Sequence, residues 1–579
     1  MDDAVGGGRR RARGLPIPRT QPARGAAVSV EARPGGRLLV RNTVLNIAGQ
    51  VLPLLVAVFT VPLVIRGLGE ARFGLLSLCW VVLGYFGIFD LGMGRAATKY
   101  VAEALGAGER EAIPGLVWSA VVVQTVFGVL GGVLLAVFTP LLMERFFTIS
   151  PDLIGEARAS FYLLAAAVPL VLVASSFRGA LEAAQRFDLI NAVRVPSSIA
   201  NYVLSLVGIV LGYRLPAIVL LLLVGRAVSA LAFAVLSFRV FPGLGRAPRT
   251  DRGALGRLLS FGGWVTVSSV TIPILTYVEQ FLIAGLLSVG ALTYYSAPYE
   301  MVSRLAIFPA AIAATLFPAY SYYQAHQRER VAELSWRPLK YLVVTAAPLL
   351  VVLVLFAPEI LDLWLRGDFA AQSTRALQVL TLSFTLNALS YIPYSAVQGL
   401  GRPDLKAKLD LVSVPLFVLL SWLLIPRYGV TGAALAKLGV TVVDATGLFW
   451  MAVRLGAFSP LRLSWQGVRG AIFAATSYGT VSLALPAVAG WGMTAKLGLA
   501  LVGGIGYTLI VWRYVLDSKE RELIWGFAGQ GSGVRGQGDA VQHSGTDVHN
   551  SGLLTAAAGE HGTPDTPQVP NPDPRIPTR

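Results

Sequence analysis

Apolar runs separated by short polar connections fill the chain from residue 42 to about residue 516. A helix needs about 20 apolar residues to cross the hydrocarbon core of a bilayer. Most of the runs reach that length, so the pattern predicts an all-α, polytopic membrane protein with about 14 transmembrane helices. The predicted spans lie near residues 42–65, 73–89, 113–139, 157–178, 187–212, 215–241, 258–287, 290–320, 339–365, 372–400, 407–426, 430–455, 468–489 and 497–516.

Two short motifs recur at nearly the same spacing. Gln185–Leu189, after the fourth span, resembles Gly401–Leu405, after the tenth, at an offset of 216 residues. Ile65–Leu68 falls opposite Ile283–Leu286 within two residues of that offset. Because each copy holds an even number of helices, six, the two copies point the same way. The repeat therefore predicts two parallel six-helix bundles, related by an axis along the membrane normal, with the substrate path between them.

The predicted organisation has six parts. They are a basic tail at residues 1–40, a first six-helix bundle at 41–243, a linker at 244–257, a second bundle at 258–456, two further transmembrane helices at 463–517, and a polar tail at 518–579. The first tail is rich in Gly, Pro and Arg and the second in Gly, Ser, Thr and Pro, compositions that favour disorder.

The composition excludes a soluble protein, because only 14% of the residues are charged and soluble domains carry about 25%. The net charge is +16, but the arginines and lysines lie between the apolar runs rather than in one patch. Cytoplasmic loops explain this distribution, and no nucleic-acid partner is expected. Alternate loops hold most of these cations, which predicts a multi-pass protein of the cytoplasmic membrane with both termini and the linker inside. Glu70 and Asp368 should then lie outside.

Nothing in the sequence predicts catalysis, a metal site or a cofactor. The single cysteine, Cys79, lies within an apolar run, and three of the four histidines lie in the C-terminal tail. There is no phosphate loop with Gly-Lys-Ser/Thr and no zinc-type histidine pattern. The loops predicted to lie outside are short. We therefore expect a protein that is not an enzyme.

The first candidate site follows the second span, at Asp90, Arg95 and Lys99. Charged groups in or at the edge of a membrane helix usually face a bundle interior or a water-filled cavity. Arg95 and Lys99 are four residues apart and share one helical face, which is unfavourable unless an anion meets them. This predicts a cavity site for an anion. The alternative is a cluster at the inner interface, with Lys99 offset by Glu103 and facing lipid headgroups.

The other candidates lie in the second predicted bundle. In the seventh and eighth spans they are Tyr277, Glu279, Gln280, Tyr299, Glu300 and Arg304. Glu300 lies near mid-membrane and four residues from Arg304, so the two can pair along one helical face. They either line a substrate path or form a structural ion pair. Asp444, midway along the twelfth span, has no charged neighbour within a turn. Asp444 and Glu279 are candidates for binding a coupling ion.

Several of these segments resemble a known family. They are Asn42–Gly67, Gly69–Gly74, Phe89–Ala96, Leu400–Leu405 and Pro426–Ala434. In order and spacing they resemble the polysaccharide (O-antigen type) flippases of the multidrug/oligosaccharidyl-lipid/polysaccharide exporter superfamily. The resemblance covers about residues 41–455. It implies a V-shaped transporter of two six-helix lobes that flips a polyprenyl-diphosphate-linked oligosaccharide for cell-surface polysaccharide synthesis. A cationic central cavity would meet the diphosphate and the sugars.

One departure from the family pattern concerns the second lobe. Family members often carry an Asp-Arg pair where this chain has Glu279 and Gln280, so an expected cation is missing there. Arg95, Lys99 and Arg304 are then the candidates for contact with the diphosphate. Beyond the substrate, the implied partners are membrane lipids and the polysaccharide polymerase and glycosyltransferases of the same pathway.

Two alternatives to a flippase stay open at this point. A cation-coupled drug exporter of the same superfamily would line its cavity with acids and aromatic residues, whereas Arg95, Lys99 and Arg304 favour an anionic substrate. A membrane enzyme, either a polysaccharide polymerase or a glycosyltransferase, typically works at a large external loop, and no such loop is predicted.

Overall fold

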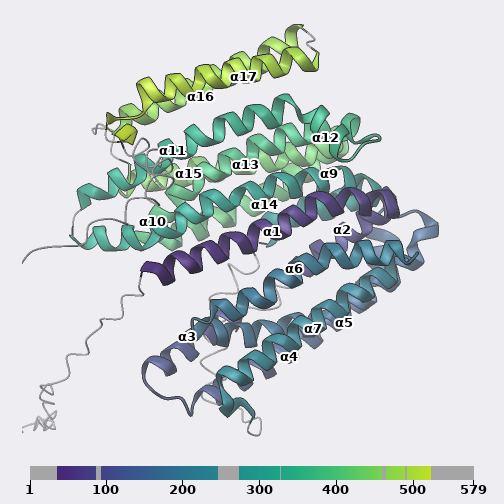
Figure 1. Ribbon diagram of the computed structural model, residues 1–579. Helices are drawn as coiled ribbons and strands as arrows, with labels where there is room; N and C mark the ends of the chain where they lie inside the picture. The colour runs from purple at the N-terminus through teal and green to yellow at the C-terminus, as the bar shows by residue number, and fades with distance from the viewer. Residues whose placement is uncertain are drawn as a thin grey trace, which may run out of the picture. The chain divides into compact units, whose positions relative to one another are not determined.

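The computed structural model describes residues 36–85, 93–245, 271, 273–326, 328–458, 464–489, 492–518 and 520–522. It divides into a unit of residues 1–516 and a second unit of residues 517–579. The described part of the first unit is built from long α-helices (Figure 1). None of the described residues lies in a strand. The all-α fold class predicted from the apolar runs is therefore confirmed.

Most helices follow the predicted runs, but the predicted span 339–365 is divided at Phe356 into two helices. The helices are α1 (Gly36–Leu68), α2 (Glu70–Tyr85), α3 (Met93–Gly106), α4 (Ile113–Leu141), α5 (Pro151–Ala183), α6 (Phe187–Val210), α7 (Leu215–Val240), the helix Pro273–Leu286, α9 (Val289–Ser303), α10 (Ile307–His326), α11 (Arg328–Leu355), α12 (Ala357–Trp364), α13 (Phe369–Gly399), α14 (Pro403–Tyr428), α15 (Val430–Arg454), α16 (Ser464–Ala489) and α17 (Met493–Ile510). Four short turns join or extend them: the π-helical η2 (Leu142–Phe146) and η5 (Val511–Val515), and the 3-10 helical η3 (Pro242–Gly245) and η4 (Arg304–Ala306).

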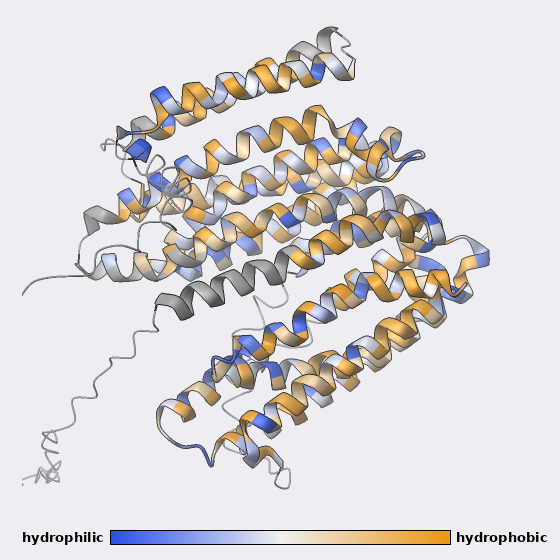
Figure 2. Cartoon of the chain, in the orientation of Figure 1, coloured by the Kyte–Doolittle hydropathy of each residue, from blue (hydrophilic) through white to orange (hydrophobic). Residues whose placement is uncertain are grey.

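Among the described residues, eight helices are long and apolar enough to cross a membrane, and Leu52–Leu68 and Pro273–Leu286 are shorter apolar helices. Hydrophobic residues, coloured orange, occupy most positions along these helices (Figure 2). Several are well exposed, among them Val137 on α4 and Phe473 on α16. An exposed apolar helix face suits lipid rather than water. The chain is a multi-pass membrane protein, and the count of about 14 spans stays a prediction.

The helices pack in two groups that match the order of the chain. In the first, α5 contacts α3, α4 and α7, and α1 contacts α6. In the second, α13 contacts α9, α10, α11, α12 and α15, while α14 packs on α15. The helices α16 and α17 contact α11. The boundaries predicted for the bundles, the linker and the tails stay predictions.

The two groups meet where α2 lies beside α9. The hydroxyls of Ser77 and Ser296, 219 positions apart, form a hydrogen bond at 3.1 Å. One turn earlier, a Cβ on Gly74 would lie 1.8 Å from the carbonyl oxygen of Val289 and 3.1 Å from the Oγ1 atom of Thr293, again 219 positions later. Equivalent residues can face each other at successive turns only if the two helices are parallel and an axis runs between them. The contact between α2 and α9, which we call the seam, therefore has the parallel relation predicted from the repeat.

The repeated motif also builds the same turn twice. The Nε and Nη2 atoms of Arg186 donate to the two carboxylate oxygens of Asp188, each at 2.9 Å. Arg402 forms the same fork with Asp404, at 2.9 and 3.1 Å. In both turns the hydrogen bond that the arginine donates to the carboxylate raises the pKa of the arginine above its ordinary value. The residue before each arginine has a positive φ, 55° at Gln185 and 74° at Gly401.

Candidate functional site

A cavity of about 480 Å³ opens among α13, α14 and α15, and α3 of the first group also reaches it. Its polar and charged lining includes Arg95, Ser383, Asn387, Tyr391, Tyr394, Gln398, Lys406, Asp410, Lys437, Thr441 and Asp444. Long helices such as α13 and α15 bring these side chains together because their polar positions face the same interior space. The cavity therefore combines residues from both halves of the chain.

Lys406 holds two acids together at one side of this cavity. Its Nζ atom lies 2.6 Å from a carboxylate oxygen of Asp410, four residues on along α14, and 2.6 Å from one of Asp444 on α15. All three side chains are less than one fifth exposed. Asp444 has no charged neighbour on its own helix within a turn, as predicted, but tertiary packing supplies one from α14. The prediction that Asp444 binds a coupling ion is untested.

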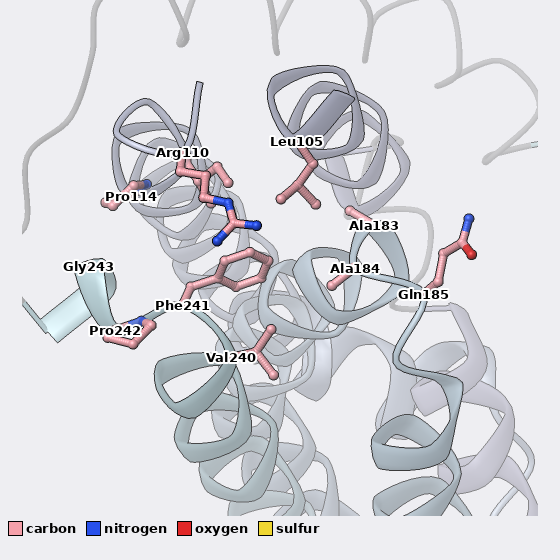
Figure 3. A pocket seen from close by; sticks show the side chains of 11 residues that line it. Leu105, Arg110, Pro114, Ala183, Ala184, Gln185, Val240, Phe241, Pro242 and Gly243 are labelled. Atoms are coloured by element: carbon pink, nitrogen blue, oxygen red, sulfur yellow. The ribbon is translucent and has the colours of Figure 1, made fainter. Parts of the chain in front are cut away.

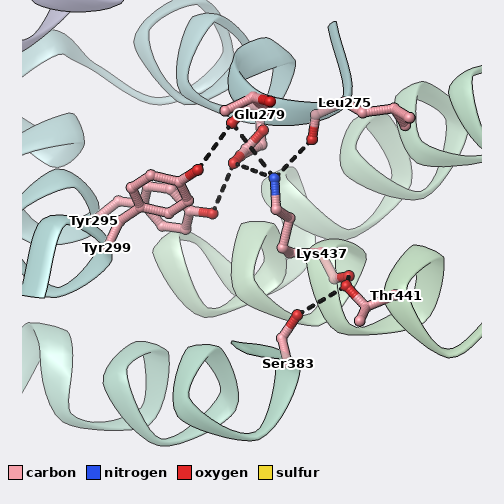
Figure 4. A network of polar contacts seen from close by, with 8 residues as sticks. Leu275, Glu279, Tyr295, Tyr299, Ser383, Lys437 and Thr441 are labelled. Atoms are coloured by element: carbon pink, nitrogen blue, oxygen red, sulfur yellow. Dashed lines mark hydrogen bonds and ion pairs between the residues drawn. The ribbon is translucent and has the colours of Figure 1, made fainter. Parts of the chain in front are cut away.

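A second ion pair lies deeper, between Glu279 and Lys437 (Figure 4). The two groups are 3.3 Å apart, and the side chain of Glu279 is completely buried. The hydroxyl of Tyr295 donates to the same carboxylate oxygen at 3.1 Å. Lys437 also donates to the carbonyl oxygen of Leu275 at 2.7 Å. A buried carboxylate needs such partners, because an unpaired charge in the interior costs several kcal/mol.

Lys437 places a cation beside Glu279, where the sequence departs from the family's Asp-Arg pattern. A family member with an Asp-Arg pair would carry its cation on the helix that here spans Pro273–Leu286. In this chain α15 supplies the cation instead, and its ammonium group lies 5.6 Å from the centre of the Tyr299 ring and 5.0 Å from that of Phe417. Sequence analysis did not single out Lys437, since a lysine within an apolar span shows no partner until the helices are packed.

Glu300 and Arg304 pair, as their spacing predicted. Arg304 lies 2.5 Å from a carboxylate oxygen of Glu300, and it donates to the hydroxyl of Tyr202 on α6 at 3.0 Å. The predicted continuous eighth span is interrupted here, because η4 separates α9 from α10 at Arg304. Arg304 thereby joins the second group of helices to the first. Substrate contact and a structural role are both compatible with this geometry.

Some of the other predicted residues surround a smaller cavity of about 70 Å³. Its polar lining is Ser77, Trp80, Tyr277, Gln280, Ser296, Tyr299 and Glu300. Tyr299 lines both cavities, since it also borders the larger one. The structure therefore brings four of the predicted residues to one place between α2 and α9: Tyr277, Gln280, Tyr299 and Glu300.

The structure places Arg95 and Lys99 of the first candidate site in different surroundings. Arg95 lines the larger cavity, and within the described part of the chain its guanidinium has no hydrogen bond or ion pair. Lys99, about half exposed, pairs with Glu103 at 3.8 Å, which is the arrangement expected of an interface cluster. Asp90 lies outside the described residues.

The charges and surface chemistry of the larger cavity suit an anionic, hydroxyl-rich ligand. Arg95, Lys406 and Lys437 are cations that can bind phosphate oxygens through charge-assisted hydrogen bonds. Tyr391 and Tyr394 offer flat faces and hydroxyls of the kind that contact sugars. No cluster of His, Cys, Asp or Glu that could hold a metal ion occurs among the described residues.

The segment that follows η2 contacts the start of α9, at the end of the seam where Gly74 meets Val289. The backbone nitrogen of Thr148 donates to the carbonyl oxygen of Ala284 at 2.9 Å, and its carbonyl oxygen accepts from the nitrogen of Val289 at 3.2 Å. The Thr148 hydroxyl donates to the carbonyl oxygen of Gly285 at 2.9 Å. We call this set of contacts the Thr148 clasp. It joins the first group of helices to the two helices that flank residue 288.

Comparisons with known proteins identify a family and a relative that resemble this chain. A family described as "Polysaccharide biosynthesis protein" matches residues 39–324. A Shigella flexneri protein named "Putative O-antigen transporter" is 26% identical over 419 residues, which is 72% of this chain and 98% of that protein.

Two solved structures share the fold. The lipid II flippase MurJ, in an inward closed conformation, aligns with a TM-score of 0.62 at 11% identity, over 82% of this chain and 99% of that one. An inward-facing multidrug resistance MATE family transporter of the MOP superfamily aligns with a TM-score of 0.61 at 17% identity, over 70% and 95% of the two chains.

Proposed function

We infer that this chain is a flippase of the polysaccharide biosynthesis protein family, which moves a polyprenyl-diphosphate-linked oligosaccharide across the cytoplasmic membrane. The single observation that carries this proposal is the composition of the larger cavity. It gathers Arg95 from the first half with Lys406 and Lys437 from the second. Lys406 and Lys437 already meet carboxylates, whereas Arg95 pairs with no acid among the described residues. A cation is costly within a membrane unless an anion meets it, and a diphosphate would meet Arg95. The unpaired guanidinium of Arg95 within the described part of the chain also favours a flippase over the drug exporter considered above.

In the proposed cycle, Arg95 and Arg304 bind the diphosphate from opposite halves. Arg304 rests on Glu300 until a phosphate oxygen displaces the carboxylate, since both are anionic acceptors for a planar guanidinium. Tyr277, Gln280 and Tyr299 line the adjoining cavity, where they would contact the sugars. Because Lys99 already pairs with Glu103, we assign it to guiding the anion toward Arg95 rather than to gripping it.

Transport requires that the cavity open to one side at a time. The Thr148 clasp and the hydrogen bond from the Thr293 hydroxyl to the carbonyl oxygen of Glu70 hold together the ends of α2, of α9 and of the helix Pro273–Leu286, which the loop charges assign to the outer face. A substrate that binds better to the outward-open arrangement would shift the population toward it. Glu279 and Asp444 are the groups that we propose to bind the coupling ion, because each is a carboxylate held by a single lysine beside the cavity.

The proposed location is the cytoplasmic membrane, with both termini in the cytoplasm. Glycosyltransferases would assemble the glycan on the inner face, and a polymerase would receive it on the outer face. Such partners fit a flippase because its substrate must be made on one side and used on the other.

The test is transport itself. Vesicles that contain the purified full-length chain and a fluorescent polyprenyl-diphosphate oligosaccharide should deliver the glycan to the opposite leaflet, where an added glycosidase or lectin detects it. The same lipid with a monophosphate should be moved more slowly, because half of the phosphate contacts are lost. If neither lipid crosses faster than in protein-free vesicles, while cationic drugs do, the flippase assignment is wrong.

A further inference from the structure

A second cavity lies at the inner end of the first group of helices, away from the site described above. It has a volume of about 470 Å³, and the ends of α3, α4, α5 and α7 surround it. Its walls are mostly apolar, with Leu105, Ala184 and Phe241 among them, and Arg110 contributes the one guanidinium. Figure 3 shows the Arg110 guanidinium beside the ring of Phe241, across the cavity from Ala184.

At the equivalent position in the second half of the chain, packed aromatic side chains fill the space. Trp336 and Phe458 are the counterparts of Trp118 and Phe241, at offsets of 218 and 217 residues. The rings of Trp336 and Phe458 pack edge to face with centroids 4.7 Å apart, and Phe458 is 2% exposed. Val468 of α16 joins the same buried cluster.

In the first half, Trp118 and Phe241 do not form the corresponding edge-to-face pair. Trp118 contacts Phe177 and Phe238 instead, and its indole nitrogen donates to the carbonyl oxygen of Leu244 at 3.2 Å. Phe241 stays partly exposed on the cavity wall. The two halves share a fold, so the open cavity is a property of the first half's own side chains rather than of the repeat.

The positive charge of Arg110 indicates which kind of ligand this cavity binds. Within the described part of the chain, no hydrogen bond or ion pair engages the Arg110 side chain. An arginine at the mouth of an apolar cavity matches an amphiphile with an anionic head and an apolar tail. The loop charges assign this end of the helices to the cytoplasmic face, where basic pockets between transmembrane helices bind anionic head groups. The volume lies in the range of small-molecule sites.

We propose that this cavity binds one anionic phospholipid of the inner leaflet, with its phosphate on Arg110 and part of an acyl chain against Leu105 and Phe241. Leu105 lies in the last turn of α3, ten residues after Arg95. A bound lipid would therefore steady the helix that carries Arg95. The inference depends on the membrane location of the chain and not on which substrate is carried.

Thermal unfolding of the full-length protein in detergent, with added lipid, tests this proposal. Phosphatidylglycerol should raise the Tm of the parent chain and of Arg178→Gln alike, since Arg178 pairs with Glu182 outside the cavity. Arg110→Gln should weaken phosphatidylglycerol binding at least tenfold. Ala184→Phe, which fills the cavity without changing charge, should do the same. Native mass spectrometry should count one fewer retained lipid in both variants.

Three results would overturn the proposal. The first is equal phosphatidylglycerol binding by the parent chain and Arg110→Gln. The second is an equal effect of phosphatidylcholine or of inorganic phosphate, which would show that no anionic lipid is selected. The third is unchanged binding in Ala184→Phe, which would place the lipid elsewhere.

Discussion

Lys406 lies at the same distance, 2.6 Å, from a carboxylate oxygen of Asp410 and from one of Asp444. One cation thus holds two acids in a partly buried place, so this triad carries an excess negative charge when both are ionised. Either a proton or a nearby cation would relieve the excess. The triad also joins α14 to α15, and a change in its charge would alter how these two helices pack.

The first prediction concerns coupling. Asp444→Asn should abolish the acceleration of transport by an imposed cation gradient, because the neutral amide binds a cation far more weakly than the carboxylate. Asp410→Asn is the matched control, since it removes the other acid of the same lysine and should keep the response. The measurement is glycan flipping in vesicles with and without the gradient. A normal gradient response in Asp444→Asn would remove this residue from the coupling mechanism.

The second prediction concerns the buried pair of Glu279 and Lys437. Lys437→Met leaves a fully buried carboxylate without its cation, and loss of one partner of a buried pair typically costs about 3–5 kcal/mol. The double variant Glu279→Gln with Lys437→Met should recover much of the stability, because no buried charge is left. Thermal unfolding of the four proteins in a double-mutant cycle measures the coupling. Additive effects of the two substitutions would contradict the pair.

The third prediction concerns the guanidinium of Arg95. Arg95→Lys should slow transport about tenfold or more, because a hydrogen bond to a charged group contributes about 1.5–3 kcal/mol and lysine cannot reproduce the planar fork. Lys99→Arg keeps the charge of a residue that already pairs with Glu103, and it should be close to neutral. Complementation of a flippase-deficient strain, with membrane expression checked in parallel, is the assay. Parental export by both Arg95→Lys and Arg95→Ala would make Arg95 structural.

The fourth prediction concerns the seam between α2 and α9. A methyl group on Gly74 would lie 1.8 Å from the carbonyl oxygen of Val289, so Gly74→Ala must push the two backbones apart. Overpacking typically costs about 1–3 kcal/mol, and transport should fall with stability. Gly155→Ala, on α5, meets no atom within 4 Å and should be neutral or slightly stabilising. An unchanged Tm in Gly74→Ala would argue against the close seam.

The fifth prediction is topological. In a Cys79→Ser background, Asp368→Cys should react with an impermeant thiol reagent added outside intact cells, whereas Gly253→Cys should react only after the membrane is opened. The background is practical because Cys79 is the only cysteine. External labelling of Gly253→Cys would invert the proposed orientation.

The fold could be predicted because its determinants lie close together in the sequence. Apolar runs of spanning length give the helices, and the twin forks of Arg186 with Asp188 and of Arg402 with Asp404 explain why the repeated motif is visible at all. The residue before each arginine adopts a positive φ, which restricts the local sequence. The pairing of Glu300 with Arg304 was predictable for the same reason, since both lie on one helical face.

The lysines of the larger cavity could not be predicted in this way. Lys406 lies near the start of a span and resembles the many loop cations, while its partner Asp444 comes from another helix. Lys437 and Glu279 are 158 positions apart. Such pairs exist only after α15 has packed on α14 and on the helix Pro273–Leu286, and one sequence contains no record of those contacts. The roles assigned to Arg95, Lys99, Arg304 and the other predicted residues stay predictions until the variants are measured.

The Thr148 clasp has a consequence for how its segment can vary. Two of its three hydrogen bonds join main-chain atoms, from Thr148 to Ala284 and from Val289 to Thr148. Every residue except proline has the same main-chain donors and acceptors. Substitutions at these positions can therefore accumulate while the two main-chain bonds remain, and only proline at Thr148 or Val289 removes a main-chain donor outright. Homologous proteins can keep these two bonds while sharing almost no side chains here.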